Sequence, residues 1–180
     1  MKKALVLLLV ALLCMGAVFA QDNAYKVSAV PYALQISTSS ASGNDAVFSQ
    51  YGFGVEGVYQ RTLGRGVFVE AGLGYDGFFM PDDRPIFGNL LMFAGAGYSH
   101  DVNEKWAFGF HLDAGVDLLF YKGKVSDTVT VKTGLGAQYH INESLNFHYG
   151  IEGTFGFSEK DETKYVNYRM YPILGISYEF

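Results

Sequence analysis

The feature that most constrains the fold is an alternation of bulky apolar residues with small or ionisable ones. It is clearest over Trp106 to Tyr121, where every even position is apolar. The odd positions of this segment are mainly Gly, Ala, His and Asp. A period of two residues indicates a β-strand, because successive side chains point to opposite faces of the strand. The segment is therefore predicted to be a strand with one hydrocarbon face and one small, polar face.

The same pattern recurs along the chain, and the sequence predicts eight antiparallel strands in total. Five further segments alternate clearly: Tyr51–Gln60, Val67–Phe79, Val129–Ile141, Leu145–Phe157 and Val166–Phe180. Two are less regular: Val30–Ile36, in which Pro31 lacks a backbone donor, and Ile86–Tyr98. Connections rich in turn-forming residues are expected at one end in Thr62–Gly66, Ser99–Lys105 and Asn142–Ser144, and at the other in Ser37–Ala46, Pro81–Pro85, Lys122–Asp127 and Ser158–Lys164.

Which face points inward decides the class of protein. Eight strands enclose an interior that is only wide enough for side chains to fill. The small face carries many of the 22 glycines and fits such an interior, whereas the face rich in Phe, Tyr, Leu and Val does not. An outward apolar surface of this extent aggregates in water but is required in lipid. The sequence thus favours a membrane-spanning β-barrel, with an exported soluble β-sandwich as the alternative.

The first twenty residues are interpreted as a cleaved export signal. They contain a basic start, an apolar core and a small-residue cleavage site, at Lys2-Lys3, Ala4–Leu13 and Val18–Ala20 respectively. Residues 21–180 are then expected to form one barrel domain. The single cysteine, Cys14, lies within the signal, so the mature chain is expected to have neither a disulfide nor a cysteine metal site. Its formal charge of 11 − 18 = −7 argues against a nucleic-acid partner.

The last nine residues resemble the C-terminal assembly signal of Gram-negative outer-membrane proteins. The signal combines a terminal Phe, an aromatic residue two positions earlier and apolar residues at alternate positions, here Phe180, Tyr178, Ile176 and Leu174. With the export signal and eight strands, the whole mature chain resembles small outer-membrane barrels such as the OmpA transmembrane domain, OmpX and the opacity-type surface proteins.

This resemblance implies an all-β fold, an eight-stranded antiparallel up-and-down transmembrane β-barrel, in the outer membrane of a Gram-negative-type bacterium. It also implies contact with outer-membrane lipid and lipopolysaccharide, recognition of the C-terminus by the barrel-assembly machinery, and a monomeric state. Aromatic residues near strand ends, among them Trp106, Tyr59 and Phe180, are typical of the girdles that such barrels place at membrane interfaces.

The inward face is predicted to hold a polar network. Its members are Glu56, Glu70, Asp76, His111, Asp113, Asp117, Lys132, His148, Glu152 and Arg169. With both chain ends in the periplasm, as the resemblance implies, Lys132 and Arg169 lie in the outer half and bridge Asp76, Asp117 and neighbouring acids. Six acids face two permanent cations, so the others must be protonated, solvated, or paired with histidine or a bound cation.

Three functions remain open at this point. The first is a non-enzymatic barrel with a packed polar interior, which contributes to envelope structure or binds an unidentified surface partner. The second is a small cation-preferring channel, in which water satisfies the interior acids. The third is a lipid A-modifying enzyme, although no predicted external loop contains a histidine to act as general base. No catalytic, cofactor or metal site is predicted; His140 and His148 lack a third metal ligand.

Overall fold

The computed structural model of the chain describes residues 22–41, 44–79, 87–121, 124–160 and 163–180. The expected export signal, residues 1–20, and the expected loop Pro81–Pro85 lie outside these ranges. No helix long and apolar enough to cross a membrane occurs among the described residues.

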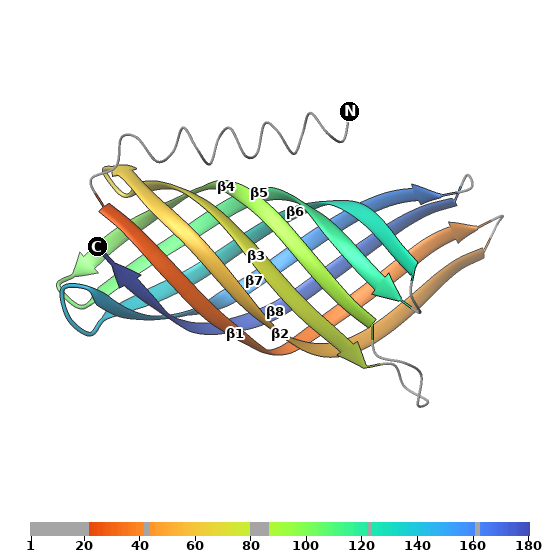
Figure 1. Cartoon of the computed structure of the whole chain (residues 1–180), viewed down its shortest axis with the longest axis horizontal. Helices are drawn as coiled ribbons and strands as arrows, with labels where there is room; N and C mark the ends of the chain where they lie inside the picture. The colour runs from red at the N-terminus through yellow and green to blue at the C-terminus, as the bar shows by residue number, and fades with distance from the viewer. Residues whose placement is uncertain (1–21, 42–43, 80–86, 122–123, 161–162) are drawn as a thin grey trace.

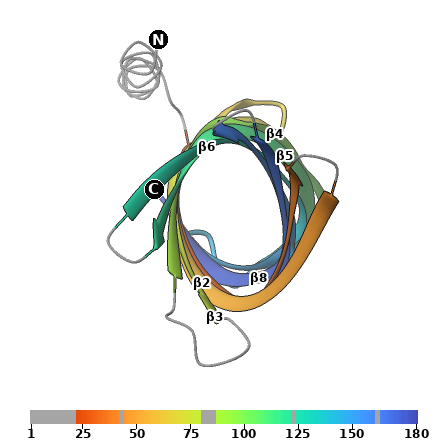
Figure 2. The same ribbon diagram turned by 90° about the vertical axis from the view of Figure 1, so that its right-hand side faces the viewer.

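Eight strands form a closed, entirely antiparallel barrel in which each strand pairs with its sequence neighbours and β8 pairs with β1 (Figures 1 and 2). This confirms the fold class that the alternation predicts. The strands are β1 (Asp22–Ala41), β2 (Asn44–Gly64), β3 (Val67–Phe79), β4 (Phe87–Asn103), β5 (Trp106–Tyr121), β6 (Lys124–His140), β7 (Leu145–Lys160) and β8 (Thr163–Glu179).

The two ends of the barrel differ. The C-terminus and the short reversals after β2, β4 and β6 lie at one end, which we call the turn end (Figure 1). The reversal between β2 and β3 uses positive φ at Gly64, Arg65 and Gly66, a conformation that a tight hairpin requires and that glycine adopts without strain. The opposite end, which we call the loop end, is where β1, β3, β5 and β7 finish.

Most expected connections are shorter than the sequence predicts, because the strands run further. The strands contain 13 to 21 residues. The expected loop Ser37–Ala46 is strand at 37–41 and 44–46, with only 42–43 outside the described residues. Parts of three other expected connections also belong to strands: residues 99–103, 124–127, 158–160 and 163–164. Turn-forming residues only permit a reversal, and the antiparallel ladder continues as long as both chains can exchange backbone hydrogen bonds.

Pro31 disturbs the register of β1, as its missing backbone donor predicts. The pairing with β2 shifts between Val30 and Ala33, and the pairing with β8 shifts between Ala29 and Leu34. The strand itself begins at Asp22, eight residues earlier than Val30, so its inward face includes residues that the sequence analysis did not assign to a strand.

The two faces of the strands have the predicted orientation. On the outside, Leu135 is 70% exposed and Leu112 is 60% exposed, whereas on the inside Asp113 and Lys132 are 2% and 1% exposed. Aromatic rings gather on the outer face near the turn end: Trp106 and Tyr139 have centroids 4.9 Å apart, and Tyr25 and Phe180 have centroids 5.3 Å apart. Most large apolar side chains therefore face outward and the network charges face inward, although Phe78, Leu91 and Phe93 are also buried.

Candidate functional site

Charged residues inside the barrel lie opposite glycines on the neighbouring strands. Asp113 pairs with Gly95 on β4, and His111 pairs with Gly97 on β4 and Gly134 on β6. Because glycine has no side chain, each such pair leaves room for one long polar side chain in an interior that is otherwise too narrow. The glycines of the small face therefore create the volume that the polar network occupies.

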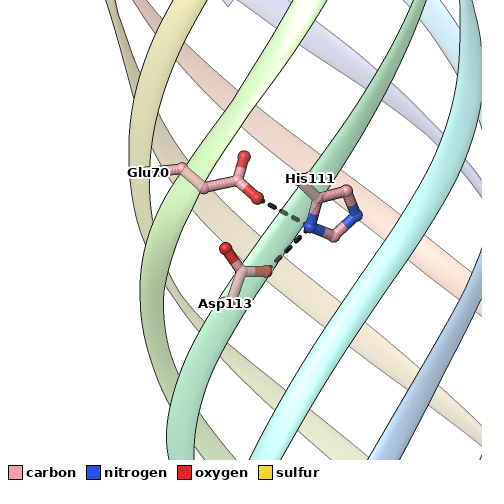
Figure 3. A group of neighbouring side chains, drawn as sticks. All are labelled: Glu70, His111 and Asp113. Carbon is pink, nitrogen blue, oxygen red and sulfur yellow. Dashed lines mark hydrogen bonds and ion pairs between the residues drawn. The ribbon is translucent and has the colours of Figure 1, made fainter.

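The central ion cluster consists of Glu56, Glu70, His111, Asp113, Lys132 and Glu152. Nδ1 of His111 lies 3.0 Å from a Glu70 oxygen and 2.8 Å from an Asp113 oxygen, so that two carboxylates from two strands approach one nitrogen (Figure 3). Nε2 of the same ring lies 3.3 Å from Glu152. The imidazole of His111 is thus surrounded by carboxylates on both of its nitrogen atoms.

Lys132 connects opposite walls of the barrel. Its Nζ donates to Glu56 at 2.6 Å and lies 2.9 Å from Glu152. It also lies 3.8 Å from the ring centroid of Phe93. Lys132 is on β6 and Glu56 is on β2, and three strands separate these two in either direction around the barrel. This ion pair therefore spans the full width of the interior.

A second group, the loop-end ion cluster, surrounds Arg169 on β8. The guanidinium donates to Asp76 at 2.8 Å, to Thr154 Oγ1 at 2.9 Å and to Asp117. Two strands lie between β8 and the strand of either aspartate. Each of the three guanidinium nitrogens donates to an acceptor on a different strand. The planar, five-donor guanidinium of arginine is suited to binding several acceptors in this way.

A cavity of about 90 Å³ lies between the central ion cluster and the turn end. Glu70, His111 and Glu152 line it, together with Lys26 and His148. His148 Nε2 lies 2.8 Å from Ser28 Oγ. The cavity is large enough for a few water molecules or a small ion.

The structure places eight of the ten predicted network residues in the buried class, and His111 and Asp117 are partly buried. Arg169 contacts Asp76 and Asp117 as expected. Of the acids expected for the two cations, Lys132 contacts the neighbouring Glu56 and Glu152, and the two aspartates are contacted by Arg169. The backbone of Lys132 lies opposite Asp113, so its side chain extends across the middle of the barrel and not towards the loop end.

Among the described residues, two cations that are at least partly buried are absent from the predicted network: Lys26, and Arg61 on β2, which is 1% exposed. Lys26 faces inward, with its Nζ 5.3 Å from the ring centroid of Phe68 and its side chain at the cavity. The sequence does contain a pattern that indicates an inward Lys26, because Ala24, Lys26 and Ser28 occupy alternate positions before Val30. Because Pro31 weakens the strand pattern, the sequence predicts a first strand that begins at Val30, too late to include Lys26.

The histidines do not form a catalytic arrangement at the loop end. His111 lies in the middle of the barrel, His140 and His148 lie towards the turn end, and His100 is exposed near the turn between β4 and β5. His140 Nδ1 is 2.7 Å from Asn146 Oδ1, an interior hydrogen bond. These four are all the histidines of the chain.

Gly134→Ala will destabilise the barrel by about 1–3 kcal/mol, the usual cost of overpacking. A Cβ at this position would lie closer than 3.0 Å to His111 Nε2 and 3.0 Å from Glu152 Cγ, while the paired backbone on both sides cannot move away. Urea unfolding of the folded barrel measures the change. Gly57→Ala is the matched control, because a Cβ there meets no atom within 4 Å. Equal stability of the two variants would show that the interior has spare room at Gly134.

No protein-family model and no curated protein matches this sequence. Solved structures do match, among them neisserial surface protein A, at 15% identity and a TM-score of 0.57, over 87% of this chain and 99% of that one. The attachment invasion locus protein Ail of Yersinia pestis matches at 16% identity and a TM-score of 0.43, over 90% of this chain and 100% of that chain. The outer membrane protease OmpT from Escherichia coli matches at 9% identity and a TM-score of 0.49, over 89% of this chain and 97% of that chain.

At 15% identity the similarity to neisserial surface protein A concerns the fold alone. The resemblance that the sequence suggests, to the small eight-stranded outer-membrane barrels, is confirmed at that level.

Proposed function

We propose that this protein is an outer-membrane β-barrel with a closed interior, which contributes to the structure of the bacterial envelope or binds a partner at its surface, and that it is not an enzyme. The observation that carries the proposal is the pair of ion clusters that join opposite walls of the barrel: Lys132 to Glu56, and Arg169 to Asp76 and Asp117.

The outer surface supports the membrane location. Large apolar residues on every strand face outward, and a surface of this kind is compatible with lipid but not with water. The closed strand order also meets the requirement of the lipid environment that backbone polar groups be paired, because each strand exchanges backbone hydrogen bonds with two neighbours. The aromatic rings near the turn end fit a membrane interface. Lipid and lipopolysaccharide are then the immediate partners of a monomeric barrel.

The C-terminal strand supports assembly by the outer-membrane insertion machinery. Leu174, Ile176, Tyr178 and Phe180 all face outward and are 45–57% exposed. The backbone of Phe180 exchanges two hydrogen bonds with Asn23, which closes the barrel at the turn end. An unpaired β8 would present this apolar row and a free strand edge to a partner before closure. Export through a cleaved signal at residues 1–20 belongs to the same proposal.

The closed interior is the reason that we favour a structural or surface role over conduction. A permeating ion would have to pass both ion clusters, and separating a buried ion pair leaves charges without partners at a cost of several kcal/mol. The alternative, a cation-preferring channel, is favoured by the cavity and by the excess of acidic residues that surround it. These two functions predict opposite electrical behaviour.

We expect the protein to be silent in planar bilayers. The sample must first show the gel-mobility shift on heating that identifies a folded barrel, so that silence cannot reflect misfolding. Discrete, cation-selective steps from such a sample would support the channel instead, and neutralising Asp113 and Glu152 together should then reduce the cation preference. Mass analysis of lipid A from cells with and without the protein tests the enzymatic alternative, for which we expect no difference.

A further inference from the structure

We propose that Glu70, His111 and Asp113 form a binding site for one divalent transition-metal ion of the zinc type inside the barrel. Imidazole nitrogen and carboxylate oxygen are both good ligands for Zn²⁺. One donor atom from each residue lies within 4.8 Å of the other two. The site does not depend on the function proposed above, because it rests on the interior geometry alone.

The distances fit a metal ion with little movement. His111 Nδ1 lies 2.8 Å from Asp113 Oδ2 and 3.0 Å from Glu70 Oε1 (Figure 3). In a tetrahedral zinc site with bonds of about 2.0–2.1 Å, neighbouring ligand atoms are roughly 3.3 Å apart. His111 Nδ1 would therefore have to move away from each carboxylate oxygen by only a few tenths of an ångström, and the oxygens of Glu70 and Asp113, which lie within 4.8 Å of one another, would adjust to the same spacing. Three ligands also leave a coordination position open, as at zinc sites that bind water or a small ligand.

The second nitrogen of His111 is held as in known zinc sites. Histidines that bind metals usually donate their other ring N–H to a carboxylate, which fixes the tautomer and the orientation of the ring. Here Nε2 lies 3.3 Å from Glu152, and Glu152 is itself held by Lys132. With the Nε2 proton facing Glu152, the lone pair of Nδ1 faces two carboxylate oxygens. Three electron-rich atoms then converge on one point, where a cation stabilises them.

One buried oxygen at the site has no partner. Asp113 is 2% exposed, and its Oδ1 makes no hydrogen bond to any residue that the structure describes. In Figure 3 this oxygen lies on the side of the carboxylate that faces Glu70. A buried carboxylate oxygen without a donor is costly, and a divalent cation bound to the same carboxylate would reduce that cost by neutralising its charge.

The local charge matches a divalent ion. Four carboxyl groups, those of Glu56, Glu70, Asp113 and Glu152, lie in and around the cluster and would carry four negative charges when ionised, and the permanent cations beside them are Lys26 and Lys132. With a neutral imidazole, the remainder is two negative charges. The cavity provides the route, since it is lined by Gln60, Ser99 and Gln138 towards the turn end and reaches Glu70 and His111.

The test measures metal binding by the folded protein, purified without a histidine tag and treated with a chelator. Equilibrium dialysis against Zn²⁺ should give one tightly bound equivalent, and Co²⁺ should give the visible absorption of a nitrogen- and oxygen-ligated ion. Asp113→Asn and His111→Gln should each weaken Zn²⁺ binding by more than the roughly 10–100-fold that loss of an outer-shell partner costs. His100→Gln, which changes an exposed histidine, should bind like the unmodified protein.

The proposal fails if the folded protein binds no Zn²⁺, which would mean that a proton alone occupies the space beside His111 Nδ1. It also fails if His111→Gln binds as tightly as the unmodified protein. Where that variant does not fold, the X-ray absorption spectrum of the zinc-loaded unmodified protein decides the matter. One imidazole per zinc is expected, whereas none or two would overturn the site, two pointing to His140 with His148.

Discussion

Lys132→Met will lower the free energy of unfolding by about 3–5 kcal/mol, the usual cost of removing one partner from a buried ion pair. The substitution keeps an unbranched side chain of similar length but removes the ammonium that contacts both Glu56 and Glu152. Lys132 is 1% exposed, so bulk water cannot replace the ammonium without rearrangement of the interior. The two carboxylates would then repel one another in the middle of the barrel.

Urea unfolding in detergent or lipid measures this change, with the gel-mobility shift on heating as a second readout. Lys105→Met is the matched control, because Lys105 is exposed at the turn between β4 and β5 and should change stability by less than about 0.5 kcal/mol. Adding Glu56→Gln and Glu152→Gln to Lys132→Met should recover part of the loss by removing the stranded charges. A loss below about 1 kcal/mol in the single variant would show that the interior is hydrated, which would favour the channel.

Leu135→Arg will destabilise the protein in a lipid bilayer by about 2–4 kcal/mol, the cost measured for arginine at the midplane on the lipid face of a barrel. Leu135 is 70% exposed on the outer face and precedes the end of β6 at His140 by five residues. At about 3.3 Å per residue and a tilt near 40°, it lies roughly 12–13 Å from the turn end, about half the height of a 25 Å apolar band.

The matched control is Leu63→Arg, because Leu63 is 59% exposed but lies beside the turn at Gly64. There the arginine can reach the headgroups, and the expected cost is about 0–1 kcal/mol. Urea unfolding in phospholipid vesicles measures both variants. In a water-exposed barrel the two substitutions would be nearly neutral, within about 0.5 kcal/mol, because both positions are on the surface. Equal and small effects would therefore contradict the membrane location.

The candidate site shows where sequence reasoning succeeds and where it stops. Alternation alone assigned His111, Asp113 and Glu70 to the inward face, and the structure places them there. It did not reveal that they share one small volume, since Glu70 is on β3 and the other two are on β5. Their meeting depends on strand stagger and on how far each side chain extends across the interior, neither of which has a local sequence signal.

The sequence by itself determined the number of strands, their antiparallel order and the inward face of the predicted network residues. Those properties follow from a period of two residues and from the width of an eight-stranded barrel, and both are expressed locally. The tertiary structure alone decided which charges pair: Lys132 with Glu56 across the barrel, and Arg169 with Asp76 and Asp117. It also decided how far each strand runs, because backbone pairing continues for as long as a neighbouring strand is present.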